Sequence, residues 1–163
     1  MTGPARTIVT TPSDRTVAIS RVFAAPRRLV FEAHIRPELV LRWMWGPDGW
    51  PLVECTIDAR VGGRFRYVWR HVEKGDMVMR GGFREIVAPE RIVHTELFDE
   101  DWTGGETVVT TLFEERDGRT SVTATVLYAS RAARDGALRS GMTDGWSQAL
   151  DRLEALLPAL DRG

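Results

Sequence analysis

The segment Arg64–His71, with the sequence RFRYVWRH, decides the fold, because two kinds of side chain alternate along it without a break. One face carries three aromatic rings and a histidine: Phe65, Tyr67, Trp69 and His71. The other face carries three arginines and a valine: Arg64, Arg66, Arg70 and Val68. Alternation with a period of two is typical of a β-strand that has one face in the core and the other in water. We therefore predict a strand here, with its aromatic rings buried and its arginines exposed.

Segments of the same kind lie on both sides of this strand, separated by turn signals. Residues 52–59 (LVECTIDA) precede it, and Gly62-Gly63 supplies a turn or bulge between the two. Lys74-Gly75-Asp76 predicts a hairpin turn into the next strand, and Asp117-Gly118 predicts another near the end. The remaining strand-like segments are residues 77–87 (MVMRGGFREIV), 91–98 (RIVHTELF), 106–115 (ETVVTTLFEE) and 119–128 (RTSVTATVLY). Six strands in series with short turns predict an antiparallel meander.

A further strand and two short helices precede this meander. Residues 16–23 (TVAISRVF) are β-branched and alternating, which predicts a strand. Pro26 then suits the first turn of a helix that continues to His34. Pro37 begins a second helix, residues 37–44 (PELVLRWM), which ends before Gly46-Pro47.

The longest predicted helix follows the last strand. Ser130 can cap its N-terminus, and we expect it to end near Leu157, because Pro158 follows. Its apolar stripe comprises Leu138, Met142, Trp146, Leu150, Leu153 and Leu157. Three glycines, each costing about 1 kcal/mol relative to alanine in a helix interior, predict a kink or a close approach. They are Gly136, Gly141 and Gly145.

Together these elements predict an α+β fold. It consists of a curved antiparallel sheet of about seven strands, two short helices after the first strand, and a long C-terminal helix across the concave face, which nothing else can cover. Residues 1–14 contain two prolines, a glycine and several threonines, and are expected to be a flexible leader before a single domain at 15–160. The 163 residues suffice to bury a substantial core.

Composition argues against several classes of partner. Lys and Arg number 22 against 23 for Asp and Glu, so neither nucleic acid nor an anionic membrane is an expected partner. No apolar run approaches the roughly 20 residues needed to cross a bilayer, and no signal peptide is apparent, so we expect a soluble, cytoplasmic protein. Cys55 is the sole cysteine and the three histidines are far apart, so we expect no disulfide, no metal and no cofactor.

Short motifs in order over roughly residues 15–157 match a known family. They are residues 43–47 (WMWGP), 58–65 (DARVGGRF), 82–91 (GFREIVAPER), Thr95-Glu96, and Gly141-Met142, Gly145-Trp146 and 150–153 (LDRL). With these motifs the sequence resembles the START-like (SRPBCC, helix-grip) superfamily and, within it, the family named for the activator of heat-shock protein 90 ATPase homologue. The resemblance implies a helix-grip fold with a cavity between helix and sheet. It implies no single reaction, because relatives include lipid carriers and cyclases.

The candidate ligand-binding residues are large apolar side chains. Their positions in the alternation of each strand or the period of the helix predict that they point into the space between sheet and helix. They are Phe65, Tyr67, Trp69, Met77, Met79, Phe83, Met142 and Trp146, with Trp43 and Trp45 at the rim or wall, and His71 beside them. One interpretation is that these side chains simply fill a core. Rigid rings and pliable methionines on a concave sheet are poor at closing every gap, which favours a cavity for an apolar ligand.

His94 and Glu96 are the candidate catalytic residues, because two residues apart on one strand they share a face. A carboxylate beside an imidazole can act as a general acid–base pair. The alternative is that both lie on the outer face while their sequence neighbours point inward. Alternation leaves this open, since the apolar Ile92 and Phe98 have the same phase as the polar pair.

Three functions are compatible with the sequence. The first is a carrier, sensor or sequestering protein whose partner is a hydrophobic or aromatic small molecule. The second is an enzyme on the same scaffold, such as a cyclase or dehydratase, with His94, Glu96, His71 or Tyr67 as acid–base groups. The third, suggested by the family name alone, is a co-chaperone-like interaction module. A homodimer is also compatible, because dimers are common among small domains of this kind.

Overall fold

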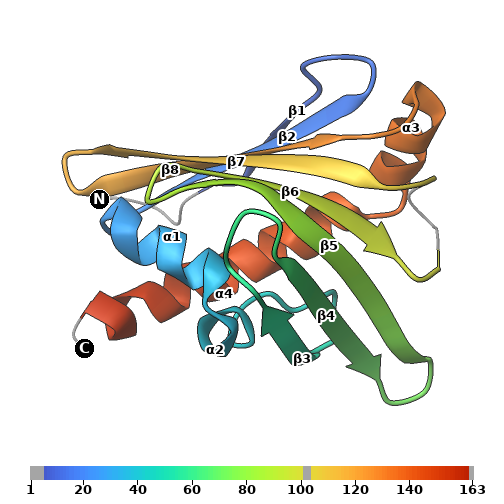
Figure 1. The fold of residues 1–163 in the computed structure, drawn as a ribbon, viewed down its shortest axis with the longest axis horizontal. Coiled ribbons are helices and arrows are strands. Elements are labelled where there is room, and N and C mark those ends of the chain that lie inside the picture. Colours follow the sequence, from blue (N-terminus) through green and yellow to red (C-terminus); the bar gives the residue numbers. More distant parts are fainter. Residues whose placement is uncertain (1–5, 101–103, 162–163) are drawn as a thin grey trace.

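A computed structural model describes residues 6–100 and 104–161 and shows a curved antiparallel sheet with a long helix across its concave side (Figure 1). Over these residues the sheet has eight strands in the order β1-β2-β8-β7-β6-β5-β4-β3. The strands are β1 (Ile8–Thr10), β2 (Thr16–Phe23), β3 (Leu52–Ile57), β4 (Arg64–His71), β5 (Gly75–Val87), β6 (Arg91–Phe98), β7 (Thr107–Arg116) and β8 (Arg119–Leu127). The helices are α1 (Arg27–Ile35), α2 (Pro37–Val40), α3 (Arg131–Arg139) and α4 (Met142–Asp161). This arrangement confirms the predicted α+β helix-grip fold.

One edge of the sheet is a strand that the sequence does not reveal. β1 pairs antiparallel with β2, with Val9 opposite Ile19, although the sequence predicts a flexible leader there. Thr7, Ile8, Val9 and Thr10 are all β-branched and suit a strand, but the run is too short to stand out between prolines. The leader prediction is therefore wrong for Ile8–Thr10, and the predicted strand number is one too low. Residues 1–5 of the predicted leader lie outside the described residues.

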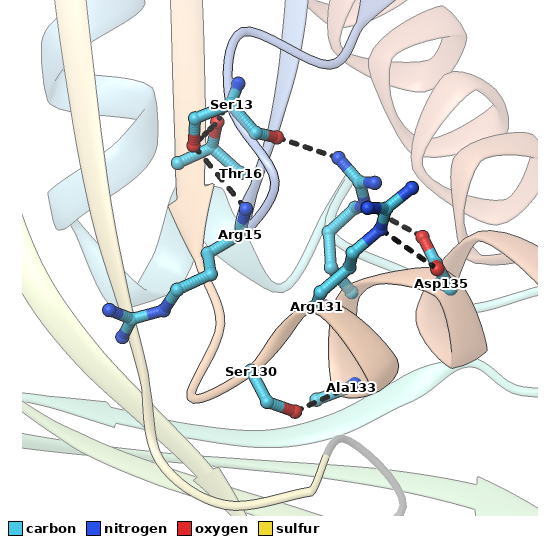
Figure 2. A network of polar contacts seen from close by, with 8 residues as sticks. Ser13, Arg15, Thr16, Ser130, Arg131, Ala133 and Asp135 are labelled. Atoms are coloured by element: carbon cyan, nitrogen blue, oxygen red, sulfur yellow. Dashed lines mark hydrogen bonds and ion pairs between the residues drawn. The ribbon is translucent and has the colours of Figure 1, made fainter.

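The segment after β1 is connected to α3 by polar contacts (Figure 2). The buried Arg134 donates from Nη1 to the carbonyl oxygen of Ser13 at 2.6 Å. Ser130 Oγ accepts from the backbone N–H of Ala133 at 3.0 Å and so caps α3, as the sequence predicts. These contacts hold the beginning of β2 beside the beginning of α3.

β4 has the two faces that its sequence predicts. Phe65, Tyr67 and Trp69 are buried. The arginines of the other face are exposed: Arg64, Arg66 and Arg70. Gly81 of β5 lies opposite Phe65, and a Cβ atom there would come within 2.5 Å of the Phe65 ring. The absence of a side chain at Gly81 therefore leaves room for the ring across the backbone of β5.

The C-terminal helical segment is two helices rather than one. Gly141 lies between α3 and α4 with φ of +82°, a left-handed conformation that favours glycine. The predicted kink is thus a complete break. α4 also continues through Pro158 to Asp161, beyond the expected end at Leu157. A proline near the end of a helix removes one backbone hydrogen bond, but its φ is compatible with helical geometry.

α4 lies across the concave face, and its apolar stripe is buried unevenly. Leu150, Leu153 and Leu157 are buried, whereas Met142 and Trp146 are only partly buried. The C-terminal half of α4 packs where α1 also contacts it, in the same hydrophobic core. The N-terminal half of α4 borders a cavity instead.

Candidate functional site

A cavity of about 790 Å³ separates the concave face of the sheet from the N-terminal half of α4. Inward-facing residues of β2 and of β4 to β8 line it on one side, and residues 142–150 of α4 line it on the other. The segment after α2 supplies a further wall. Small-molecule sites typically have volumes of roughly 300–1,000 Å³. Most lining side chains are aromatic, aliphatic or methionine, so the cavity favours an apolar ligand.

All but one of the candidate ligand-binding residues border this cavity. Those that do are Trp43, Trp45, Phe65, Tyr67, Trp69, Met77, Met79, Phe83, Met142 and Trp146. The exception is His71, whose Nδ1 accepts hydrogen bonds from the backbone N–H groups of Glu73 and Lys74, both at 3.1 Å. The structure thus corrects the placement of His71, which is the last residue of β4 and stabilises the β4–β5 hairpin.

Three indole groups fix the walls of the cavity. Trp43 donates from Nε1 to the carbonyl oxygen of Ala33, and Trp69 donates to that of Met44, both at 2.9 Å. Trp43 is completely buried, whereas Trp45 is 38 % exposed and stands at the rim. The Trp45 indole also donates to a backbone carbonyl, at 2.8 Å. These bonds hold the rings in place, so the walls cannot simply collapse into the empty space.

His94 and Glu96 both point into the cavity from β6, together with Ile92 and Phe98. The distance from His94 Nε2 to Glu96 Oε2 is 2.9 Å, and the two side chains are 18 % and 21 % exposed. A ring nitrogen that contacts a carboxylate at this distance acts as the donor, so we assign the proton to Nε2. The alternative placement on the outer face is wrong, because the two apolar residues of the same phase belong to the interior.

His34 and Tyr128, which the sequence analysis missed, also border the cavity, and both have shifted pKa values. Burial lowers the pKa of His34 to about 4, so its ring is neutral at neutral pH, and its Nδ1 donates to the carbonyl oxygen of Val30 at 2.7 Å. Burial raises the pKa of Tyr128 to about 12, and its hydroxyl donates to Met142 Sδ at 3.0 Å. The period-two phase of β8 indicates that Tyr128 points inward, whereas no sequence signal distinguishes His34 from a core residue.

Arg21 is a third residue that the sequence analysis missed. It is 2 % exposed, borders the cavity from β2, and forms ion pairs with Asp151 at 2.5 Å and Glu154 at 3.0 Å. Both carboxylates belong to α4, so Arg21 ties the middle of this helix to the sheet. A buried guanidinium requires such partners, because an unpaired charge in the interior is costly.

Other kinds of site find no support in the described residues. They contain no group of three or more His, Cys, Asp or Glu side chains that could hold a metal ion. Burial raises the pKa of the Cys55 thiol to about 12, so it remains protonated and unreactive. Within residues 6–100 and 104–161, no helix combines the length and apolar character needed to cross a membrane.

An antiparallel sheet that curves around a C-terminal helix and leaves a cavity between them defines a START-like, helix-grip protein. Within this class, residues 24–158 match the family described as Activator of Hsp90 ATPase homolog 1-like protein, and the chain belongs to that family. The resemblance inferred from the sequence motifs is therefore confirmed.

Solved structures of similar proteins share this fold over nearly the whole chain. A crystal structure of a protein from Rhodobacter sphaeroides has 30 % sequence identity and a TM-score of 0.88, covering 94 % of this chain and 99 % of that one. A solution structure from Arthrobacter aurescens has 25 % identity and a TM-score of 0.84, covering 93 % and 91 %. A crystal structure from Mycobacterium smegmatis has 27 % identity and a TM-score of 0.81, covering 94 % and 97 %. No curated protein matches the chain.

Proposed function

We propose that this protein binds a hydrophobic or aromatic small molecule in the cavity, as a carrier, sensor or sequestering protein. The observation that carries the proposal is the apolar cavity of about 790 Å³ between α4 and the sheet. Its volume suits a molecule of several fused rings or a long acyl chain.

The fixed positions of the tryptophan side chains in the cavity wall support this proposal. Trp43 and Trp69 are held by hydrogen bonds to backbone carbonyls of neighbouring segments. A planar apolar ligand could therefore pack against these rings without a rearrangement, which lowers the entropic cost of binding.

A fluorescence titration with N-phenylnaphthylamine, a neutral aromatic probe that brightens in apolar surroundings, tests the proposal. We expect saturable binding to the wild-type protein and none to Ala124→Phe, because Ala124 borders the cavity and the added ring would occupy it. Ala132→Phe, on the exposed face of α3, is the matched control and should bind the probe as the wild type does. Circular dichroism of both variants separates loss of the site from loss of the fold. A folded wild-type protein that shows no saturable binding would contradict the proposal.

The His94–Glu96 pair favours a second candidate function, an enzyme that performs acid–base chemistry on a bound apolar substrate. General acid–base catalysis requires a proton donor and acceptor at the substrate, and this pair faces the cavity with its two groups 2.9 Å apart. Native mass spectrometry of protein purified from its source distinguishes the two functions through the molecule that co-purifies. A molecule retained unchanged on incubation supports a carrier. A molecule that is converted supports an enzyme, and Glu96→Gln should then lower turnover by roughly 10²–10⁴-fold while it keeps the shape of the site.

A further inference from the structure

The cavity contains polar atoms that the protein itself does not pair. Glu96 accepts from His94 through Oε2, and its Oε1 has no hydrogen-bond partner in the described part of the chain. Tyr67 is only 7 % exposed and borders the same cavity, and its hydroxyl likewise has no partner among residues 6–100 and 104–161. Buried polar groups are nearly always hydrogen-bonded. An unpaired acceptor and an unpaired donor that border one cavity are therefore both available to a ligand bound there.

Tyr67 and the His94–Glu96 pair are both close to the Phe65 ring. The centroid of the Phe65 ring is 5.1 Å from that of Tyr67 and 5.4 Å from that of His94. Burial, with smaller contributions from Cys55 and Glu96, raises the pKa of Tyr67 well above its ordinary value. Tyr67 therefore keeps its proton and remains a hydrogen-bond donor at the same cavity as the acceptor on Glu96.

Among the other charged groups that border the cavity, Arg21 has one buried nitrogen, Nε, without a hydrogen-bond partner in the described part of the chain. Arg21 is neutralised by two carboxylates of α4. The remaining charged lining residues are exposed at the mouth: Lys74, Asp76, Asp99 and Glu100. Within the described interior, the charge that a ligand meets beside Tyr67 is thus the carboxylate of Glu96.

On the basis of the proposed function, we propose that Glu96 Oε1 and the Tyr67 hydroxyl together recognise a hydroxyl group on the ligand. The ligand hydroxyl donates to the carboxylate and accepts from the tyrosine, so both unpaired groups are satisfied by one atom. The ligand class is an apolar alcohol or phenol. A carboxylate in the same position would place two negative charges together in a region of low dielectric, and its binding is correspondingly weaker.

A comparison of three probes on one ring system tests this inference: pyrene, pyrenemethanol and pyrenecarboxylate. Pyrene has no polar group and reports binding in the cavity alone. We expect pyrenemethanol to bind the wild-type protein at least about tenfold more tightly than pyrenecarboxylate. The alcohol gains a charge-assisted hydrogen bond to Glu96, whereas the carboxylate is repelled by it, and one such bond corresponds to about this ratio of affinities. Titrations are made at about pH 8, where an ordinary imidazole is uncharged.

Two substitutions then assign the selectivity to the named groups. Glu96→Gln keeps the shape and removes the charge, so the ratio of the two affinities should fall to within about threefold. Tyr67→Phe should weaken pyrenemethanol by about five- to tenfold and leave pyrene unchanged, because only the hydroxyl is lost. Glu114→Gln, which removes an equal charge from an exposed position on β7, is the matched control and should leave the ratio as in the wild type.

The outcomes separate this inference from the proposed function. Pyrene that binds while pyrenecarboxylate binds as tightly as pyrenemethanol would overturn the inference and keep the cavity as an apolar site. A preference for the alcohol that Glu96→Gln leaves unchanged would also overturn it. Absence of binding by all three probes would overturn the proposed function and this inference with it. If a variant fails to fold, the ratio of the pyrenemethanol and pyrenecarboxylate affinities of the wild-type protein still tests the inference.

Discussion

Around the C-terminal half of α4 the space between helix and sheet is filled, whereas around its N-terminal half the space is hollow. At the filled end, Leu153 and Leu157 are buried in the same core as Phe31 of α1 and Phe113 of β7. At the hollow end, Met142 and Trp146 are partly buried and border the same cavity as Tyr67 and Trp69. One helix with one apolar stripe thus serves two purposes. At the filled end α1 also contacts α4, and Phe31 of α1 belongs to the same core as Leu153 and Leu157.

Core packing and the proposed binding site thus lie at opposite ends of a single helix. The filled end supplies the free energy that holds α4 on the sheet, and Arg21 fixes it there through two carboxylates. The hollow end can then remain open without a loss of fold. Substitutions at the two ends should therefore differ in kind, with losses of stability at one end and losses of binding at the other.

The largest expected effect contrasts Leu153→Ala with Met142→Ala. Leu153 is completely buried, so its truncation should lower the free energy of unfolding by about 3–4 kcal/mol. Met142 borders the cavity, where truncation leaves no new closed void but removes the acceptor of the Tyr128 hydroxyl, so the loss should be about 1–2 kcal/mol. Urea denaturation followed by circular dichroism measures both. Equal losses at the two positions would show that the hollow end is packed in solution.

A second contrast uses the two tryptophans of the wall and the rim. Trp43→Phe leaves a void and removes the donor to the Ala33 carbonyl, so we expect a loss of about 2–3 kcal/mol. Trp45→Phe, at a position that is 38 % exposed, should cost about 0.5 kcal/mol. Thermal unfolding of the two variants gives the comparison. A larger loss of stability for Trp45→Phe than for Trp43→Phe would mean that Trp45 contributes more to core packing than its exposure indicates.

The smallest effect concerns His34, which lies at the boundary between the two ends. Its ring contacts Trp43 and Phe113, and its pKa is lowered from 6.5 to about 4 by burial. Because the unfolded chain binds this proton more readily than the folded one, stability is complete above about pH 6.5 and falls as the pH decreases toward about 4. A fully dry site would give a loss of about 3 kcal/mol, and the partial exposure of the ring reduces this to about 1–2 kcal/mol.

His34→Gln tests this pH dependence, because glutamine does not titrate in that range. We expect the denaturant midpoints of the wild type and the variant to converge or cross as the pH is lowered from about 7 to about 4. Over this range the wild type loses the stability that depends on a neutral His34, whereas the variant does not. Parallel curves would show that His34 is solvated and that the hollow end extends beyond the described cavity.

The sequence predicted the sheet well because its strongest signals are local. The alternation in Arg64–His71 is long and consistent, so burial of Tyr67 and Trp69 followed directly. β1 was not predictable, because a three-residue strand is defined by its pairing with β2 rather than by its own composition. The break at Gly141 was foreseen only as a kink, since the cost of a glycine does not reveal whether a helix bends or stops.

The site was predicted less completely than the fold. Strand phase gave the aromatic lining, but it failed for His71, where the strand ends and the side chain turns to the hairpin. The alternation of residues along β6 did not show which face His94 and Glu96 occupy, because this strand has apolar residues on both faces. Tyr67, in contrast, was assigned correctly to the cavity, although its unpaired hydroxyl is visible only in three dimensions.

The ion pairs of Arg21 with Asp151 and Glu154 have a mechanical consequence. They act as a fulcrum in the middle of α4, with residues 142–150 extending from it over the cavity as a lever arm of about 13 Å. At the far end of this arm the break at Gly141 interrupts the helix, and the Tyr128 hydroxyl and Thr7 contact the arm at Met142 and Ser147. A rotation of about 5° about the fulcrum moves that end by about 1 Å. A displacement of this size at the end of the arm would change the height of the cavity and leave the filled end of α4 in place.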